Sequence, residues 1–259
     1  MTHPVTTATP VRGPVLGLTA QLVLLGLLAV TPGLTTFGLA AGVIYGIVLT
    51  GLLAAGLERT SAARLGAANA VTLGRAVLVG GVTAMVVTSF TMNINVAILV
   101  VAAGVALALD GVDGQVARRT RTTSALGARF DMEIDAFLIL VLSVYAGDRF
   151  GWWTVALGAY RYLFVAASWA MPWMTAALPP RFSRKTVAAI QGVVLALVTP
   201  DLLPHAAAVI ALVIALGTLT WSFGRDIVWL HHARRVREAA RTRWSARPAW
   251  TTEAPAVVH

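Results

Sequence analysis

Charged residues are scarce in this chain, and cysteine is absent. Without cysteine the chain can form neither a disulfide nor a thiolate metal site. Only 12% of its 259 residues are charged, whereas a soluble globular domain carries about 25%. Strand-like alternation of apolar and polar residues is also missing. Since 58% of the residues are hydrophobic, the sequence predicts an all-α integral membrane protein.

Long apolar runs separated by short breaks organise the sequence. A stretch of about 20 apolar residues crosses a bilayer as a helix. The breaks contain turn residues, such as Pro32 with Gly33 and Pro179 with Pro180. We therefore expect eight transmembrane helices in one bundle, at 14–31, 36–57, 69–90, 94–111, 131–147, 152–174, 186–202 and 205–223.

The basic residues suggest a membrane orientation. A net charge of +9 would also fit a nucleic-acid-binding protein, but the arginines lie between or after the apolar runs. They gather in alternate segments, which is the pattern of the positive-inside rule. Those segments are 58–68, 112–130, 175–185 and the tail after 224. We expect no nucleic-acid partner, a plasma-membrane location and both termini in the cytoplasm.

Four aspartates frame the fourth and fifth predicted helices: Asp110, Asp113, Asp131 and Asp135. Residues three or four apart share one face of a helix. If the two helices are antiparallel neighbours, all four carboxylates converge at one end. Because four like charges repel each other, the group requires cations, and carboxylate oxygens favour hard ions such as Mg²⁺ or Mn²⁺.

This stretch resembles the signature of the CDP-alcohol phosphatidyltransferases, D-x2-D-G-x2-A-R-x8-G-x3-D-x3-D. A polar loop whose acids balance nearby arginines would explain the charge but not the spacing. The resemblance covers about 66–225 and implies a six-helix core, with 1–65 as a two-helix extension and 226–259 as a basic cytoplasmic helix and disordered tail. All eight fixed positions are present: Asp110, Asp113, Gly114, Ala117, Arg118, Gly127, Asp131 and Asp135.

The resemblance also implies a reaction. In this family a CDP-linked lipid, usually CDP-diacylglycerol, donates a phosphatidyl group to a small alcohol, and CMP leaves. The four aspartates would hold two divalent cations, Mg²⁺ or Mn²⁺, with Asp135 also the base for the acceptor hydroxyl. Arg118 would hold a phosphate. Gly114, Ala117 and Gly127 would leave room for the nucleotide.

A second segment, Asn69, Thr72 and Arg75, resembles the Asn-x-x-Thr-x-x-Arg pattern that lies beside the nucleotide pocket in this family. Ala68 stands where a proline often precedes the pattern. The alternative is an interfacial cap in which Arg75 extends to lipid phosphates.

Four further cations are candidates for binding the acceptor: Arg161, Arg181, Arg184 and Lys185. Arg161 lies inside the sixth predicted span, where an unpaired charge is costly. A phosphorylated polyol, such as glycerol 3-phosphate or inositol phosphate, would supply its anion. In the alternative, Arg161 pairs inside the protein and the others only set topology, which leaves free inositol or serine as acceptors. The segment from Lys185 to Gln191 resembles that of phosphatidylglycerophosphate synthases only faintly, because two extra residues separate Thr186 from Gln191.

Two other classes of protein use intramembrane acids. Prenyltransferases with aspartate-bound Mg²⁺ usually carry two aspartate-rich motifs, whereas the acids outside 110–135 are solitary in the sequence. Cation transporters place acids near the bilayer midplane in repeated halves, and no repeat is visible here.

Glycines at 38, 42 and 46 form a stripe on the second predicted helix. Small residues at this spacing allow helices to approach closely. The stripe predicts either a homodimer contact or packing against the core of the same chain.

Overall fold

The computed structural model describes residues 12–31, 33–60, 67–120, 125–176, 178 and 182–245. Every regular element within these residues is helical, so the predicted all-α class is confirmed. Two 3₁₀ turns, η1 (Trp152–Val155) and η2 (Pro172–Thr175), flank α6. The α-helices are α1 (Arg12–Val30), α2 (Thr36–Thr60), α3 (Ala67–Ser89), α4 (Val96–Thr120), α5 (Ala125–Phe150), α6 (Ala156–Ala170), α7 (Phe182–Val198) and α8 (His205–Ser245).

Several of these helices are suited to cross a membrane. In the described part of the chain, four apolar segments are long enough: Gly13–Val30, Thr36–Leu57, Val71–Ser89 and His205–Ala239. Two shorter apolar segments, Val96–Gly111 and Thr186–Val198, belong to α4 and α7. The protein is therefore a polytopic membrane protein.

The helix boundaries differ from the predicted spans where charge or proline intervenes. Most of 112–130, which lies between two predicted spans, is helical, because α4 runs to Thr120 and α5 begins at Ala125. Alanine, arginine and glutamine in this stretch are good helix formers. The predicted span 152–174 is divided into η1, α6 and η2, and Pro172 starts η2. Proline cannot continue the hydrogen-bond ladder of α6.

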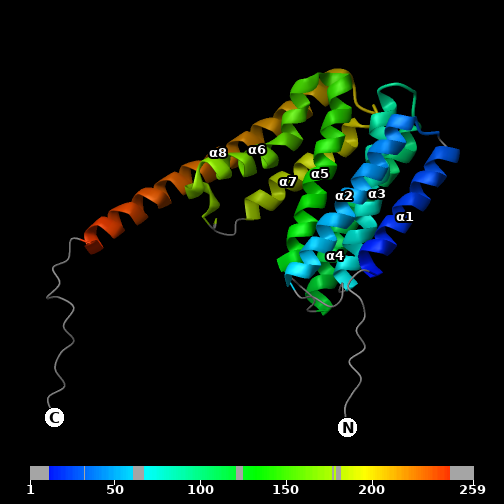
Figure 1. Cartoon of the computed structure of the whole chain (residues 1–259). Helices are drawn as coiled ribbons and strands as arrows, with labels where there is room; N and C mark the ends of the chain where they lie inside the picture. Colours follow the sequence, from blue (N-terminus) through cyan, green and yellow to red (C-terminus); the bar gives the residue numbers. More distant parts are fainter. Residues whose placement is uncertain are drawn as a thin grey trace, which may run out of the picture.

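The last helix is longer than predicted. A membrane helix followed by a separate basic helix was expected, but α8 is continuous over 41 residues. At 1.5 Å per residue it is about 62 Å long, roughly twice the hydrocarbon thickness of a bilayer. No proline interrupts its sequence. Figure 1 shows the end of α8 extending well beyond the rest of the bundle. The predicted disordered tail, from 246 on, lies outside the described residues.

Helix α3 is the centre of the bundle and packs against α1, α2, α4 and α5. Figure 1 shows α1 and α2 beside α3, with α8 on the other side of the molecule. Apolar side chains of α3, α4 and α5 fill the core, among them Met85, Leu99 and Leu138, which are at most 1% exposed. This packing places the start of α3, the end of α4 and the start of α5 at one end of the bundle.

The glycine stripe of α2 packs inside the chain. A Cβ atom added at Gly38 would lie 2.1 Å from Thr88 Oγ1 and 2.5 Å from the Ala84 carbonyl oxygen, both on α3. At Gly42 it would lie 2.6 Å from a methyl carbon of Leu25 on α1. The stripe thus accounts for the close packing of α1, α2 and α3, and a homodimer through it is not supported.

We expect Gly38→Ala to destabilise the protein by about 1–3 kcal/mol, the usual cost of overpacking a tight contact. The clash involves a backbone carbonyl, which cannot move as a flexible side chain does. The matched control is Gly51→Ala on the same helix, where an added Cβ meets nothing within 4 Å. Thermal unfolding in detergent measures both, and equal midpoints for the two variants would contradict this packing.

A second close approach joins α5 and α6. A Cβ atom added at Gly158 would lie 2.2 Å from Leu140 Cα and 2.7 Å from its nitrogen. The two backbones are therefore in direct contact at this level.

Candidate active site

Three of the four signature aspartates lie together at the end of the bundle shared by α3, α4 and α5. Asp110 comes from α4, and Asp131 and Asp135 come from one face of α5. One carboxylate oxygen of each lies within 4.8 Å of the others. The side chain of Asp113 lies outside the described residues. The geometry follows from the four-residue spacing on α5 and the packing of α4 and α5 around α3.

The guanidinium of Arg75, on α3, lies among these carboxylates. Its Nη1 pairs with Asp131 Oδ1 and, at 3.1 Å, with Asp110 Oδ1, and its Nη2 pairs with Asp135 Oδ1. Its Nε donates to the carbonyl oxygen of Ala106 at 3.1 Å. The planar fork of arginine suits this set of acceptors, whereas lysine presents a single point charge. Arg75 thus ties α3 to both helices that carry the signature.

Burial excludes one of the two interpretations of Arg75. Its side chain is 0% exposed, whereas those of Asp110, Asp131 and Asp135 are 45%, 32% and 34% exposed. Extension of Arg75 to lipid phosphates at the interface is therefore wrong. The carboxylates keep an open side to which a ligand has access.

The charge and donor set fit a divalent cation. Three carboxyl groups face one guanidinium, so acidic groups outnumber basic ones among these four side chains. The donors are hard oxygens, the ligands that Mg²⁺ and Mn²⁺ prefer. Their spacing, within 4.8 Å, allows a common ion to be shared.

The other predicted nucleotide-site residues are described only in part. Thr72 lies one turn before Arg75 on α3 and is 4% exposed. Gly127 lies in the first turn of α5. Beyond their helical backbone, the remaining members fall outside the described residues: Asn69, Gly114, Ala117 and Arg118.

Arg161 has an anion partner that the sequence did not reveal. Its guanidinium pairs with Glu133, through Nη2 to Oε1 and, at 3.4 Å, through Nε to Oε2. Glu133 lies between Asp131 and Asp135 but points off their face, because residues two apart diverge on a helix. The premise that Arg161 lacks an anion within the protein is therefore wrong. The pair nevertheless places Arg161 next to the aspartate site.

Arg184 and Lys185 lie in the first turn of α7. Arg184 pairs with Asp226 of α8 at 2.9 Å, and Arg225 donates to Ser183 Oγ at 3.0 Å. Asp226, solitary in the sequence, is thus buried in a contact between α7 and α8. Arg181 and the side chain of Lys185 lie outside the described residues.

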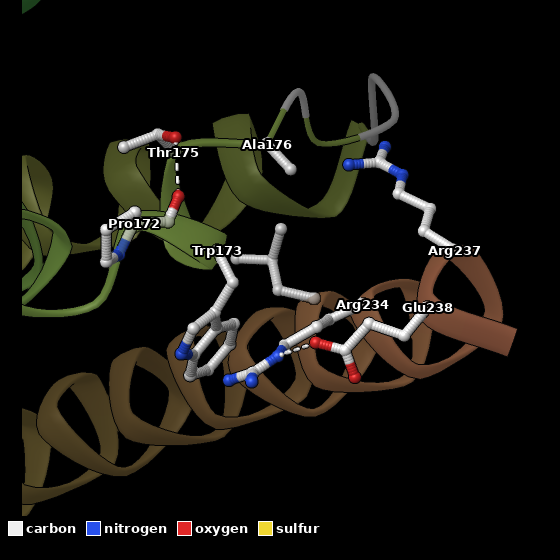
Figure 2. A pocket seen from close by; sticks show the side chains of 8 residues that line it. Pro172, Trp173, Thr175, Ala176, Arg234, Arg237 and Glu238 are labelled. Atoms are coloured by element: carbon white, nitrogen blue, oxygen red, sulfur yellow. Dashed lines mark hydrogen bonds and ion pairs between the residues drawn. The ribbon is translucent and has the colours of Figure 1, made fainter. Parts of the chain in front are cut away.

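A groove of about 250 Å³ lies apart from this site, where η2 meets the far part of α8 (Figure 2). Trp173 lies on one wall, and on the other Arg234 pairs with Glu238 at 2.7 Å. No predicted site residue lines the groove. We therefore exclude it from the active site.

Asp110, Asp131 and Asp135, gathered around a buried arginine in a membrane bundle, form a group of carboxylates that could hold a metal ion. The family model for CDP-alcohol phosphatidyltransferase matches residues 65–221, and the chain belongs to this family. No curated protein and no solved structure matches the chain. The family transfers a phosphatidyl group from a CDP-alcohol to an alcohol and uses divalent metal ions. Membership decides against a prenyltransferase and against a cation transporter.

Proposed function

We propose that this protein transfers a phosphatidyl group from CDP-diacylglycerol to a phosphorylated polyol and releases CMP. The observation that carries the proposal is the trio Asp110, Asp131 and Asp135 gathered around Arg75. A diphosphate brings negative charge to a site of negative carboxylates, so binding requires cations there. The signature and the buried arginine supply both the cation ligands and a fixed positive charge.

Each signature residue has a proposed role. Asp110, Asp113 and Asp131 would hold two divalent cations, and Asp135 would complete the second site and accept the proton of the attacking hydroxyl. Bound there, such cations would supply neutralising charge to the attacking and the leaving oxygens. Arg118 binds a phosphate of the nucleotide through its planar fork.

The nucleotide pocket is proposed on the side of α3 that carries Thr72 and Arg75, three residues apart and both buried. Asn69 lies one further turn toward the start of the helix. Gly114, Ala117 and Gly127 leave space for the base and ribose.

CMP release by the purified protein tests the function. We expect release from CDP-diacylglycerol only in the presence of an alcohol acceptor and Mg²⁺ or Mn²⁺, and loss of release with EDTA. An EDTA-treated sample restored by excess metal is the control for irreversible damage. Full turnover in a metal-free preparation would contradict the proposal.

We place the acceptor phosphate beside Arg161, where it would compete with Glu133 for the guanidinium. Its partner Glu133 is 53% exposed and lies on the same turn of α5 as the aspartates. An acceptor phosphate arriving beside the site would meet a guanidinium through charge-assisted hydrogen bonds. Arg181, Arg184 and Lys185, on or before the start of α7, complete the proposed acceptor site.

We expect Arg161→Ala to raise the KM of the acceptor about tenfold and to leave the KM of CDP-diacylglycerol unchanged, because one charge-assisted hydrogen bond contributes about 1.5–3 kcal/mol. Glu133→Gln is the matched variant, since it removes the competing anion and should not raise the acceptor KM. Initial rates with glycerol 3-phosphate and inositol phosphate measure both. A screen in which serine or free inositol is the better acceptor would overturn the assignment.

The arginine distribution supports a plasma-membrane protein with the active site and both termini in the cytoplasm. A nucleotide-linked substrate would reach the active site from the cytoplasmic side of the membrane. Accessibility of cysteines introduced singly into this cysteine-free chain would test the orientation.

A further inference from the structure

Helix α2 precedes the family match at 65–221, yet it contacts α5 beside the aspartates. The ring of Tyr45 stacks on Phe137, with centroids 5.1 Å apart and planes 25° from parallel. Phe137 follows Asp135 by two residues. The N-terminal helix pair therefore reaches the helix that carries two of the three clustered carboxylates.

The hydroxyl of Tyr45 is the unusual part of this contact. It is buried, and within the described residues it has no hydrogen-bond partner. It lies close enough to Arg75 and Tyr162 to interact with them electrostatically. A buried hydroxyl that loses water without gaining a partner destabilises the folded state, so few are retained without a reason.

A phenol hydroxyl in this place is suited to donate to an anion. The positive charge of Arg75 acts on this hydroxyl, and under the function proposed above the phosphate-bearing substrate binds at the carboxylates around Arg75. Phenylalanine would keep the stacking on Phe137 without burying an unpartnered polar group. The polar atom is therefore not explained by the packing of α2 on α5.

We propose that Tyr45 is an active-site residue supplied from outside the family-matched segment, and that its hydroxyl donates a hydrogen bond to an oxygen of the substrate diphosphate. The proposal rests on the function proposed above. It gives the N-terminal helix pair a direct part in substrate binding.

Tyr45→Phe separates a functional hydroxyl from a structural one. We expect the thermal midpoint of the ligand-free protein to rise, because the unpartnered hydroxyl is removed. We expect kcat/KM for CDP-diacylglycerol to fall about 10–100-fold, the equivalent of one hydrogen bond to a charged group. The increase in midpoint on adding CDP-diacylglycerol should shrink as well.

Tyr145→Phe is the matched control. Its hydroxyl is also buried without a partner among the described residues, but it lies toward the other end of α5, beneath Arg149. This variant should be stabilised in the same way and keep wild-type kcat/KM. Tyr45→Phe with wild-type kcat/KM would overturn the role of Tyr45 alone, whereas absence of CMP release by the wild-type protein would overturn the proposed function and this role with it.

Discussion

Asp131→Asn is expected to lower CMP release by about 10²–10³-fold, the usual effect of removing one preorganised electrostatic group from an active site. Asp131 shares the carboxylate cluster with Asp110 and Asp135, so its loss removes a metal ligand and one unit of the charge that attracts cations. The protein should still insert and fold, because Arg75 keeps two of its three carboxylate partners. CMP release and the detergent-solubilised melting curve are the two measurements.

Asp148→Asn is the matched control for this prediction, since Asp148 lies exposed at the opposite end of α5. It should keep wild-type turnover.

Asp135→Asn provides a contrast within the cluster: if Asp135 is mainly the base, transfer falls about 10²–10⁴-fold while CDP-diacylglycerol binding is largely spared. Substantial turnover by Asp131→Asn would remove that side chain from the catalytic group.

Arg75→Ala is expected to destabilise the metal-free protein more than any single aspartate substitution. It leaves three neighbouring carboxylates without their guanidinium and the Ala106 carbonyl without its donor. Breaking a buried ion pair costs about 3–5 kcal/mol, and partial exposure of the carboxylates reduces this through solvent screening. Unfolding curves in EDTA should show the loss, and Mg²⁺ should recover part of it.

The increase in thermal midpoint on adding Mg²⁺ is the more specific test of the role of Arg75. The variant site carries one more unit of negative charge, so the increase in thermal midpoint on adding Mg²⁺ should exceed that of the wild type. Arg161→Ala, which removes a guanidinium from α6 but leaves Arg75 in place, serves as the control and should respond to Mg²⁺ as the wild type does. If Mg²⁺ raises the thermal midpoint of Arg75→Ala less than that of the wild type, Arg75 supports metal binding. The idea that its guanidinium takes the place of the cation's positive charge would then be wrong.

The sequence predicted those features that depend on local periodicity. Apolar runs located the helices, and the four-residue spacing of Asp131 and Asp135 predicted a shared face, which is what the structure contains. The boundary between a membrane span and a basic surface helix was predicted wrongly, because a change from apolar to basic residues does not end a helix. A proline in the helix interior or a C-terminal cap would do so, but α8 has no proline, and Gly224, at the change from apolar to basic residues, lies within the continuous helix.

Ion pairs between side chains on different helices could not be predicted, because they depend on which face each helix turns toward its neighbours. Arg75 had two open interpretations, and only the packing of α3 against α4 and α5 decides that it is buried. Glu133 and Asp226 belong to no spacing pattern that points to a partner, so nothing in the sequence indicated that they pair with Arg161 and Arg184.

The backbone contact at Gly158 has a consequence for charge placement. Arg161 is one turn further along α6, and α6 runs antiparallel to α5 from the short connection at Gly151. At this contact the backbones of α5 and α6 are so close that an added Cβ at Gly158 would lie 2.2 Å from Leu140 Cα. At that separation Arg161 spans to Glu133, one turn beyond the point opposite it. Glycine at position 158 therefore allows Arg161 to reach Glu133. Any larger residue there would force α6 away from α5 and would move Arg161 away from Glu133 and the neighbouring aspartates.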